Sequence, residues 1–284
     1  LPILNNSGGF RRCGTDMMDK NEILRSKKLY LFDMDGTLYL GNRLYEFAPA
    51  LLDTLRATGR KYLFLTNNSS KSVSKYVEKM ERLHLPATAA DFFTSTDAAC
   101  AYLKRNWHGK KIYALGTASF KEQLMAAGFP ITDQLEDDID CLLMGYDTEL
   151  TYRKLEDACI LLGRGVDYLA TNPDWVCPTA YGSAPDCGSF AQMLEHATGR
   201  MPYFIGKPRP AIAELAMEKM GCTKEETVLI GDRLYTDIAC GVNAGIPTCL
   251  VLSGEATLKD LEESDVKPTF ICQDIAEIYG YIKE

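Results

Sequence analysis

The 284-residue sequence contains only three histidines and two tryptophans, and it has no excess of basic residues. None of its ten cysteines forms a C-x-x-C pair, which excludes the common spacings of zinc sites. Lysine and arginine total 31 against 39 acidic residues, giving a formal net charge of -8. Nucleic-acid binding requires a basic surface. The sequence therefore predicts no nucleic-acid partner, and an anionic substrate would be attracted only locally.

Long apolar runs are absent as well. None approaches the roughly 18 residues that a membrane span requires, so we expect no membrane association. Most cysteines lie within apolar runs, as buried thiols do, and Cys177 and Cys187 flank a loop. Reduced thiols at this count, with no signal-peptide core, predict a cytoplasmic location. The sequence does not begin with methionine, and we expect either upstream residues or a start at Met17 or Met18.

The stretch LYLFDMDGTL, residues 29–38, organises the rest of the chain. Its apolar start followed by acidic residues and glycine is typical of a buried parallel strand that ends in a turn. Side chains alternate along a strand, so Asp33 and Asp35 begin on the same face. Two adjacent carboxylates repel each other, and a hard divalent cation with oxygen ligands is the natural counter-charge.

Strands and helices alternate along most of the chain, with 46% hydrophobic and 25% charged residues overall. This pattern predicts an α/β fold with a Rossmann-like parallel sheet, helices on both faces, and a smaller inserted α/β domain. We expect a flexible extension over residues 1–28, a core over 29–107 and 202–284, and the inserted domain over 108–201. A strand beginning at Pro202 returns the chain to the core, and residues 171–186 are expected to be irregular.

Acidic, hydroxyl and basic side chains follow four of the predicted strands. They are Asp33 with Asp35, Thr66 with Asn67, Lys207, and Asp232 with Asp237. Hydrolysis of a phosphate monoester needs such a set, because its uncatalysed barrier must be lowered by roughly 20 kcal/mol or more. A carboxylate attacks phosphorus, a second acid transfers protons, and a cation, a lysine and a hydroxyl stabilise the phosphoryl oxygens.

The motifs DMDGT, LTNN, GKP and GDRLYTD, in this order, resemble the four motifs of the haloacid dehalogenase superfamily of phosphatases. The position of the insertion is similar to that in the branch with a large α/β cap, which includes 4-nitrophenyl, phosphoglycolate and pyridoxal phosphate phosphatases. The segment ATNPD, residues 170–174, resembles a cap segment that faces the active site.

The resemblance implies a role for each motif residue. Asp33 is then the nucleophile and Asp35 the general acid and base. Magnesium would be bound by Asp33, by the backbone carbonyl of Asp35 and by Asp232. The implied substrate-binding residues are Thr66, Asn67, Asn68 and Lys207, with Asp237 supporting the water shell of the metal.

We therefore predict a magnesium-dependent phosphatase that hydrolyses small phosphorylated metabolites through an aspartyl-phosphate. Within the cap, Asn172, Asp174 and Trp175 are expected to touch the leaving group. Alternatives are a catalytically inactive module that binds phosphometabolites and a phosphotransferase or phosphomutase of the same superfamily. A dehalogenase is disfavoured because Asp35 serves only where a leaving oxygen must be protonated. A two-component receiver domain is also disfavoured, because it would be about half as long as this chain. A homo-oligomer is compatible with the sequence.

Overall fold

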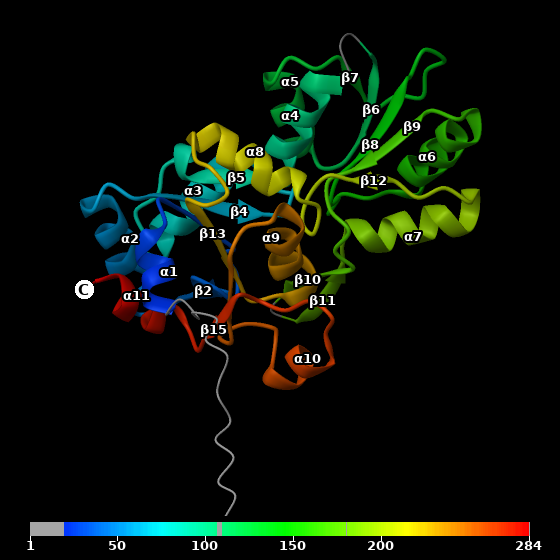
Figure 1. Ribbon diagram of the computed structural model, residues 1–284. Helices are drawn as coiled ribbons and strands as arrows, with labels where there is room; N and C mark the ends of the chain where they lie inside the picture. Colours follow the sequence, from blue (N-terminus) through cyan, green and yellow to red (C-terminus); the bar gives the residue numbers. More distant parts are fainter. Residues whose placement is uncertain (1–19, 107–109, 180, 284) are drawn as a thin grey trace, which may run out of the picture.

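Two parallel β-sheets form the centre of the protein, which we analyse as a computed structural model (Figure 1). The structure describes residues 20–106, 110–179 and 181–283. The six-stranded sheet has the order β15-β14-β13-β1-β4-β5 and all its strand pairs are parallel. Its strands are β1 (Leu29–Phe32), β4 (Lys61–Thr66), β5 (Phe92–Thr94), β13 (Thr227–Gly231), β14 (Thr248–Val251) and β15 (Phe270–Cys272). The predicted α/β class is confirmed.

Helices cover both faces of this sheet because alternate strand residues bury into opposite layers. In β1, Tyr30 and Phe32 pack into one apolar cluster, whereas Leu29 and Leu31 pack into another. The first cluster includes residues of α1 (Lys20–Ser26), α2 (Ala48–Ala57), α3 (Val73–Arg82) and α11 (Ile275–Ile282). The second includes residues of α4 (Ser95–Asn106), α8 (Ala211–Met220) and α9 (Ala239–Ala244).

A second, five-stranded parallel sheet has the order β12-β9-β8-β6-β7. Its strands are β6 (Ile112–Leu115), β7 (Ile131–Thr132), β8 (Cys141–Met144), β9 (Asp167–Ala170) and β12 (Tyr203–Phe204). The helices α5 (Ala118–Ala126), α6 (Tyr152–Arg164) and α7 (Cys187–Thr198) accompany it. The prediction that the strand after Pro202 belongs to the first sheet is wrong, since Tyr203 and Phe204 pair with Leu169 and Ala170 of β9.

Two short hairpins were not predicted from the sequence. One joins β2 (Tyr39–Leu40) to β3 (Arg43–Leu44), and the other joins β10 (Val176–Thr179) to β11 (Gly182–Pro185). The second lies in the stretch 171–186 that we expected to be irregular. Its strands are largely exposed and contain prolines and glycine, so they lack the apolar alternation by which a strand is recognised.

Part of the predicted flexible extension is ordered. Residues 1–19 lie outside the described residues, but Lys20–Ser26 forms α1. Leu24 is fully buried in the cluster beside α2 and α11, and the Arg25 side chain donates a hydrogen bond to the Tyr281 carbonyl (2.7 Å). One apolar anchor in a short polar segment gives too little periodicity to predict this helix. The remaining elements are the short helices at Ala89–Asp91, Leu234–Ile238 (η2) and Leu258–Glu263 (α10).

Among the described residues, no helix combines the length and apolarity that crossing a membrane would require.

The burial of Leu24 predicts that α1 contributes to stability. Replacing Leu24 with alanine should lower the free energy of unfolding by about 2–5 kcal/mol, because a fully buried leucine leaves a cavity. Urea denaturation followed by circular dichroism measures this loss. Glu22→Ala, on the exposed side of the same helix, is the control and should change stability by less than about 0.5 kcal/mol. Equal midpoints for the two variants would contradict the packing of α1.

Candidate active site

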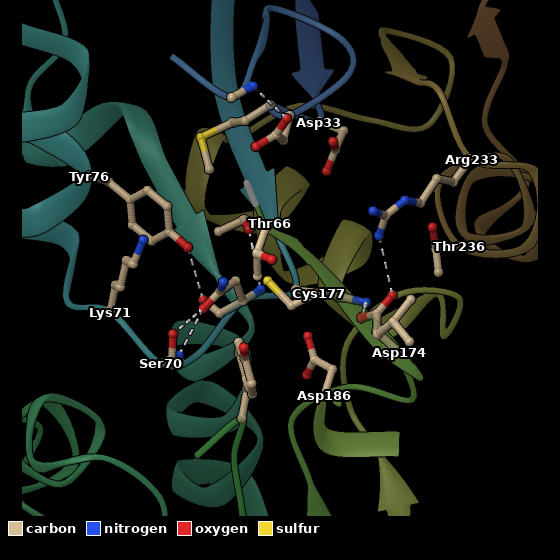
Figure 2. A pocket seen from close by; sticks show the side chains of 18 of the residues that line it. Asp33, Thr66, Ser70, Lys71, Tyr76, Asp174, Cys177, Asp186, Arg233 and Thr236 are labelled. Atoms are coloured by element: carbon tan, nitrogen blue, oxygen red, sulfur yellow. Dashed lines mark hydrogen bonds and ion pairs between the residues drawn. The ribbon is translucent and has the colours of Figure 1, made fainter. Parts of the chain in front are cut away.

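The carboxyl ends of β1, β4 and β13 meet at a cavity of about 700 Å³. Asp33 follows β1 directly, Thr66 ends β4, and Asp232 follows β13. Lys207 follows β12 of the other sheet, so both sheets deliver side chains to the same place. Figure 2 shows Asp33 and Thr66 on one side of the cavity, with Arg233 and Asp174 on another. The strand ends thus assemble residues that lie up to about 200 positions apart.

A buried lysine connects two of the carboxylates. Lys207 Nζ lies 2.6 Å from Asp33 Oδ1, 2.6 Å from Asp237 Oδ1, and 3.0 Å from the Leu65 carbonyl oxygen. Burial acts to lower the pKa of Lys207, but the carboxylates of Asp237 and Asp33 outweigh it and raise this pKa above its usual value. The lysine is therefore a permanent positive charge beside Asp33.

Three carboxylates crowd around this lysine. Oxygens of Asp33, Asp232 and Asp237 all lie within 4.8 Å of one another. Burial first, and then the neighbouring carboxylates, raise the pKa values of Asp33 and Asp232 above their ordinary range. One lysine does not balance three buried carboxylates. A donor set made only of oxygens with excess negative charge fits a hard divalent cation such as Mg²⁺.

The turn after β1 is shaped around Asp232. Gly36 has φ +92°, and a Cβ atom built on it would lie 2.3 Å from Asp232 Oδ2. Thr37 Oγ1 donates to Asp232 Oδ1 (3.3 Å), and the Glu255 amide donates to Asp232 Oδ2 (2.8 Å). The sequence DGT therefore provides both the positive φ and the space that let Asp232 approach Asp33.

Asp35 lies apart from this cluster, on the cavity side of the β1 turn. Its side chain is 45% exposed, and its Oδ1 accepts a hydrogen bond from the Gly41 amide (3.2 Å) in the β2–β3 hairpin. Lys79 Nζ lies 3.8 Å from Asp35 Oδ2. Asp35 lines the cavity, and its side chain is not among the three clustered carboxylates.

The two asparagines after β4 line the cavity and also make hydrogen bonds within the protein. Asn67 Nδ2 donates to Asp174 Oδ2 (2.7 Å) and to the Lys207 carbonyl (2.9 Å), while the Lys207 amide donates to Asn67 Oδ1 (2.8 Å). Asn68 Oδ1 accepts from the backbone and hydroxyl of Ser70. Thr66, Asn67, Asn68 and Lys207 all line the cavity, so all four remain candidates for contact with a phosphoryl group.

The loop before the β10–β11 hairpin differs from its sequence prediction. Asn172 is fully buried, and its Nδ2 donates to Asp174 Oδ2 (2.8 Å) and Asp186 Oδ1 (3.0 Å). Trp175 is 58% exposed, and neither it nor Asn172 lines the cavity. The prediction that they touch a leaving group is therefore wrong for both residues. Asp174 does line the cavity, together with Cys177 and Asp186 from the hairpin and its end.

Comparison with known proteins identifies the family. A haloacid dehalogenase-like hydrolase model matches residues 30–130, and a HAD-hydrolase-like model matches residues 204–278. An acid sugar phosphatase of Staphylococcus aureus is 34% identical over 261 residues, which cover 92% of this chain and 100% of the relative. The chain belongs to the haloacid dehalogenase-like hydrolases.

Solved structures of this family agree with the assignment. A 4-nitrophenylphosphatase from Thermotoga maritima is 37% identical, with a TM-score of 0.87 over 92% of this chain and 99% of that one. A glycerol phosphate phosphatase from Mycobacterium tuberculosis, in complex with magnesium, is 29% identical with a TM-score of 0.85, covering 90% of this chain and 78% of that one. This hydrolase is accordingly a phosphoric monoester hydrolase, and the alternative of an inactive binding module is set aside.

Sequence reasoning missed several cavity residues of this hydrolase. Arg233 lies within GDRLYTD, and its Nη1 is 3.7 Å from Asp174 Oδ1. Lys71 and Lys79 lie in and near α3 and also line the cavity. Arg233 lies between the motif residues Asp232 and Asp237, and this position alone could have indicated that its side chain reaches the cavity. With Lys207, the residues Lys71, Lys79 and Arg233 make four cationic side chains, which face four carboxylates in the same lining, those of Asp33, Asp35, Asp174 and Asp186. The cations therefore offset local negative charge that would otherwise repel an anionic substrate.

The contact between Gly36 and Asp232 predicts a selective loss of activity. Gly36→Ala should reduce kcat for 4-nitrophenyl phosphate by about 100-fold, because the new methyl group must displace the Asp232 carboxylate. Gly59→Ala is the matched control, since Gly59 also has a positive φ (+68°) but has no atom within 4 Å of its built Cβ. Steady-state kinetics on both variants, with folding checked by circular dichroism, makes the comparison. If Gly36→Ala kept as much activity as Gly59→Ala, the contact with Asp232 would not be needed for catalysis.

Proposed function

We propose that this phosphatase hydrolyses small phosphate monoesters with Mg²⁺ and through an aspartyl-phosphate on Asp33. The observation that carries the proposal is the Asp33 carboxylate beside Lys207 Nζ (2.6 Å), at a cavity into which Asp35 also projects. A charged lysine next to the attacking carboxylate offsets its repulsion from a phosphate dianion. Asp33 is thus the proposed nucleophile, and Lys207 and Thr66 hold phosphoryl oxygens.

Asp35 is the proposed general acid and base. Asp33 Oδ forms a bond to phosphorus while the bond from phosphorus to the alcohol oxygen breaks, and Asp35 gives its proton to that oxygen. Water then attacks the phosphorus of the aspartyl-phosphate and gives a proton to Asp35, while the bond from phosphorus to Asp33 Oδ breaks. Phosphate is released, the Asp33 carboxylate is restored and Asp35 is protonated again. The exposed side of Asp35 and its hydrogen bond from Gly41 suit a group that must reach the leaving oxygen.

Asp33, Asp232 and the backbone carbonyl of Asp35 are the proposed ligands of Mg²⁺, with Asp237 supporting its water shell. The buried, oxygen-only cluster supports this assignment. When bound, the metal orients the phosphoryl group and screens its charge. Asn67 and Asn68 are the further proposed substrate-binding residues, because both line the cavity and hydrogen bonds within the protein fix their orientation.

We propose that the inserted unit, which contains the five-stranded sheet from β6 to β12, acts as a cap that selects small substrates. Its hairpin contributes Cys177, Thr179 and Asp186 to the cavity wall, opposite the strand ends of the core. A cavity of about 700 Å³ that is walled on both sides suits a metabolite-sized ester better than a folded protein. The cytoplasm is the proposed location, on the cysteine content of the sequence. No observation favours the phosphomutase alternative.

The nucleophile assignment predicts the behaviour of Asp33→Asn. Turnover should fall by on the order of 10⁴-fold or more, because the amide has the shape of the carboxylate but cannot attack phosphorus. Phosphate release is measured on protein whose intact mass verifies that the asparagine has not deamidated. Asp53→Asn, an exposed change on α2, is the matched control and should keep full activity. Multiple turnover by Asp33→Asn above a mock purification would rule out the covalent route.

The oxygen-only cluster predicts a specific metal requirement. EDTA should abolish activity and Mg²⁺ should restore it, whereas Ca²⁺ should not, because its larger and looser coordination would misplace the attacking carboxylate. Activity is measured after chelation and stepwise addition of each ion. Undiminished activity in excess chelator would refute the proposed metal site.

A further inference from the structure

Lys79 lies beside Asp35, the proposed general acid, and the proposed function gives it no part in the reaction. It belongs to α3, whose residues Tyr76 and Met80 are buried in the core cluster on one face of the six-stranded sheet. The Lys79 side chain is 19% exposed, and its Nζ lies 3.8 Å from Asp35 Oδ2. A helix that is anchored in the core therefore delivers this cation to the cavity.

An aromatic ring holds the ammonium group in this position. Lys79 Nζ lies 3.9 Å from the centroid of the Tyr39 ring, which is well within the range of cation–π attraction. Tyr39 is 2% exposed and packs in the same core cluster as α3. Its backbone carbonyl accepts a hydrogen bond from the Gly36 amide (2.7 Å), and Tyr39 forms a β-bridge with Asp35. Tyr39 thus supports both the turn that carries Asp35 and the cation beside it.

The Asp35 side chain has few other partners. Its Oδ1 accepts a hydrogen bond from the Gly41 amide (3.2 Å), and Lys79 is the only cation among the described residues that forms an ion pair with its carboxylate. Burial lowers the pKa of Lys79, and the carboxylate of Asp35 opposes that change. Because Asp35 is 45% exposed, this ion pair contributes little to the stability of the fold. Its main effect is therefore on the orientation of the Asp35 carboxyl group.

We propose that Lys79 is a positioning residue that acts on the reaction through Asp35. The ammonium group attracts Asp35 Oδ2 while the Gly41 amide holds Oδ1, so the carboxyl group keeps the orientation from which it protonates the leaving oxygen. As the bond from phosphorus to the alcohol oxygen breaks, the proton moves from Asp35 to that oxygen, and the nearby positive charge stabilises the carboxylate that forms. The inference rests on the proposed function, because it takes Asp35 as the general acid.

The test compares two esters that differ in their need for a proton on the leaving oxygen. The 4-nitrophenolate ion departs without a proton, whereas the alkoxide of propyl phosphate needs one. The measurement is kcat/KM, which covers the steps up to release of the alcohol and so excludes the later return of a proton from water. Lys79→Met should lower kcat/KM for propyl phosphate by about tenfold or more beyond its loss for 4-nitrophenyl phosphate. Lys79→Arg should restore most of that difference, because arginine keeps the charge and also stacks on aromatic rings.

Lys75→Met is the matched control, because Lys75 lies one turn earlier on α3, pairs with Glu78 and does not line the cavity. It should leave kcat/KM unchanged for both esters, and circular dichroism verifies that each variant is folded. In the double variant Asp35→Asn with Lys79→Met, the difference between the esters should be no larger than with Asp35→Asn alone, because the lysine acts through that carboxyl group.

Equal losses for the two esters with Lys79→Met would overturn the inference, since a lysine that contacts the phosphoryl group affects every ester alike. A Lys79→Arg variant that behaves like Lys79→Met would overturn it as well. Failure of the proposed function is distinct from these results. It would appear as an Asp35→Asn variant that loses activity equally on both esters, or as turnover by Asp33→Asn.

Discussion

The ion pairs of Lys207 with Asp33 and Asp237 are the interaction on which the rest of the site depends. All three groups are largely withdrawn from water, and the two Nζ–oxygen distances are 2.6 Å. Removing one partner from a buried pair costs about 3–5 kcal/mol, because the remaining charge is left uncompensated. Lys207 lies beyond β12, Asp33 beyond β1 and Asp237 within η2, so this contact ties three distant segments together. The site and the packing of the two sheets therefore stabilise each other.

The sequence predicts the parts of this arrangement that depend on strand ends. Asp33 and Asp232 follow two buried strands that are 198 positions apart, yet β1 and β13 pair directly, with Leu29 opposite Thr227. Each strand and the turn after it can be recognised locally, from an apolar run that ends in acidic and glycine residues. Parallel strands then bring their carboxyl ends to one edge, and so the candidate site could be assembled without coordinates. The α/β class followed from the same alternation of strands and helices.

The features that could not be predicted depend on tertiary contacts. The β10–β11 hairpin has little apolar alternation, and its position is fixed by Asn172, whose amide joins Asp174 to Asp186. The sequence shows Asn172 and Trp175 in a polar loop but not which of their side chains turns inward or away. Likewise, β12 is two residues long, and only its pairing with β9 decides to which sheet it belongs. The orientation of these side chains and the sheet to which β12 belongs are thus determined by tertiary contacts and not by the local sequence.

Asp174, in the loop before the β10–β11 hairpin, contacts residues that follow β4 and β13 of the six-stranded sheet. Asp174 Oδ2 accepts a hydrogen bond from Asn67, and Asn67 in turn accepts one from the Lys207 amide. The other oxygen of this carboxylate, Oδ1, is buried and makes no hydrogen bond with the described residues. It lies 3.7 Å from Arg233 Nη1. A carboxylate buried in this way is tolerated only while the cationic side chain stays near it. Separation of the hairpin from the core would remove the hydrogen bond of Asp174 with Asn67 and its ion pair with Arg233. The walls of the cavity and the loops that hold its reactive groups are thus formed by the same contacts.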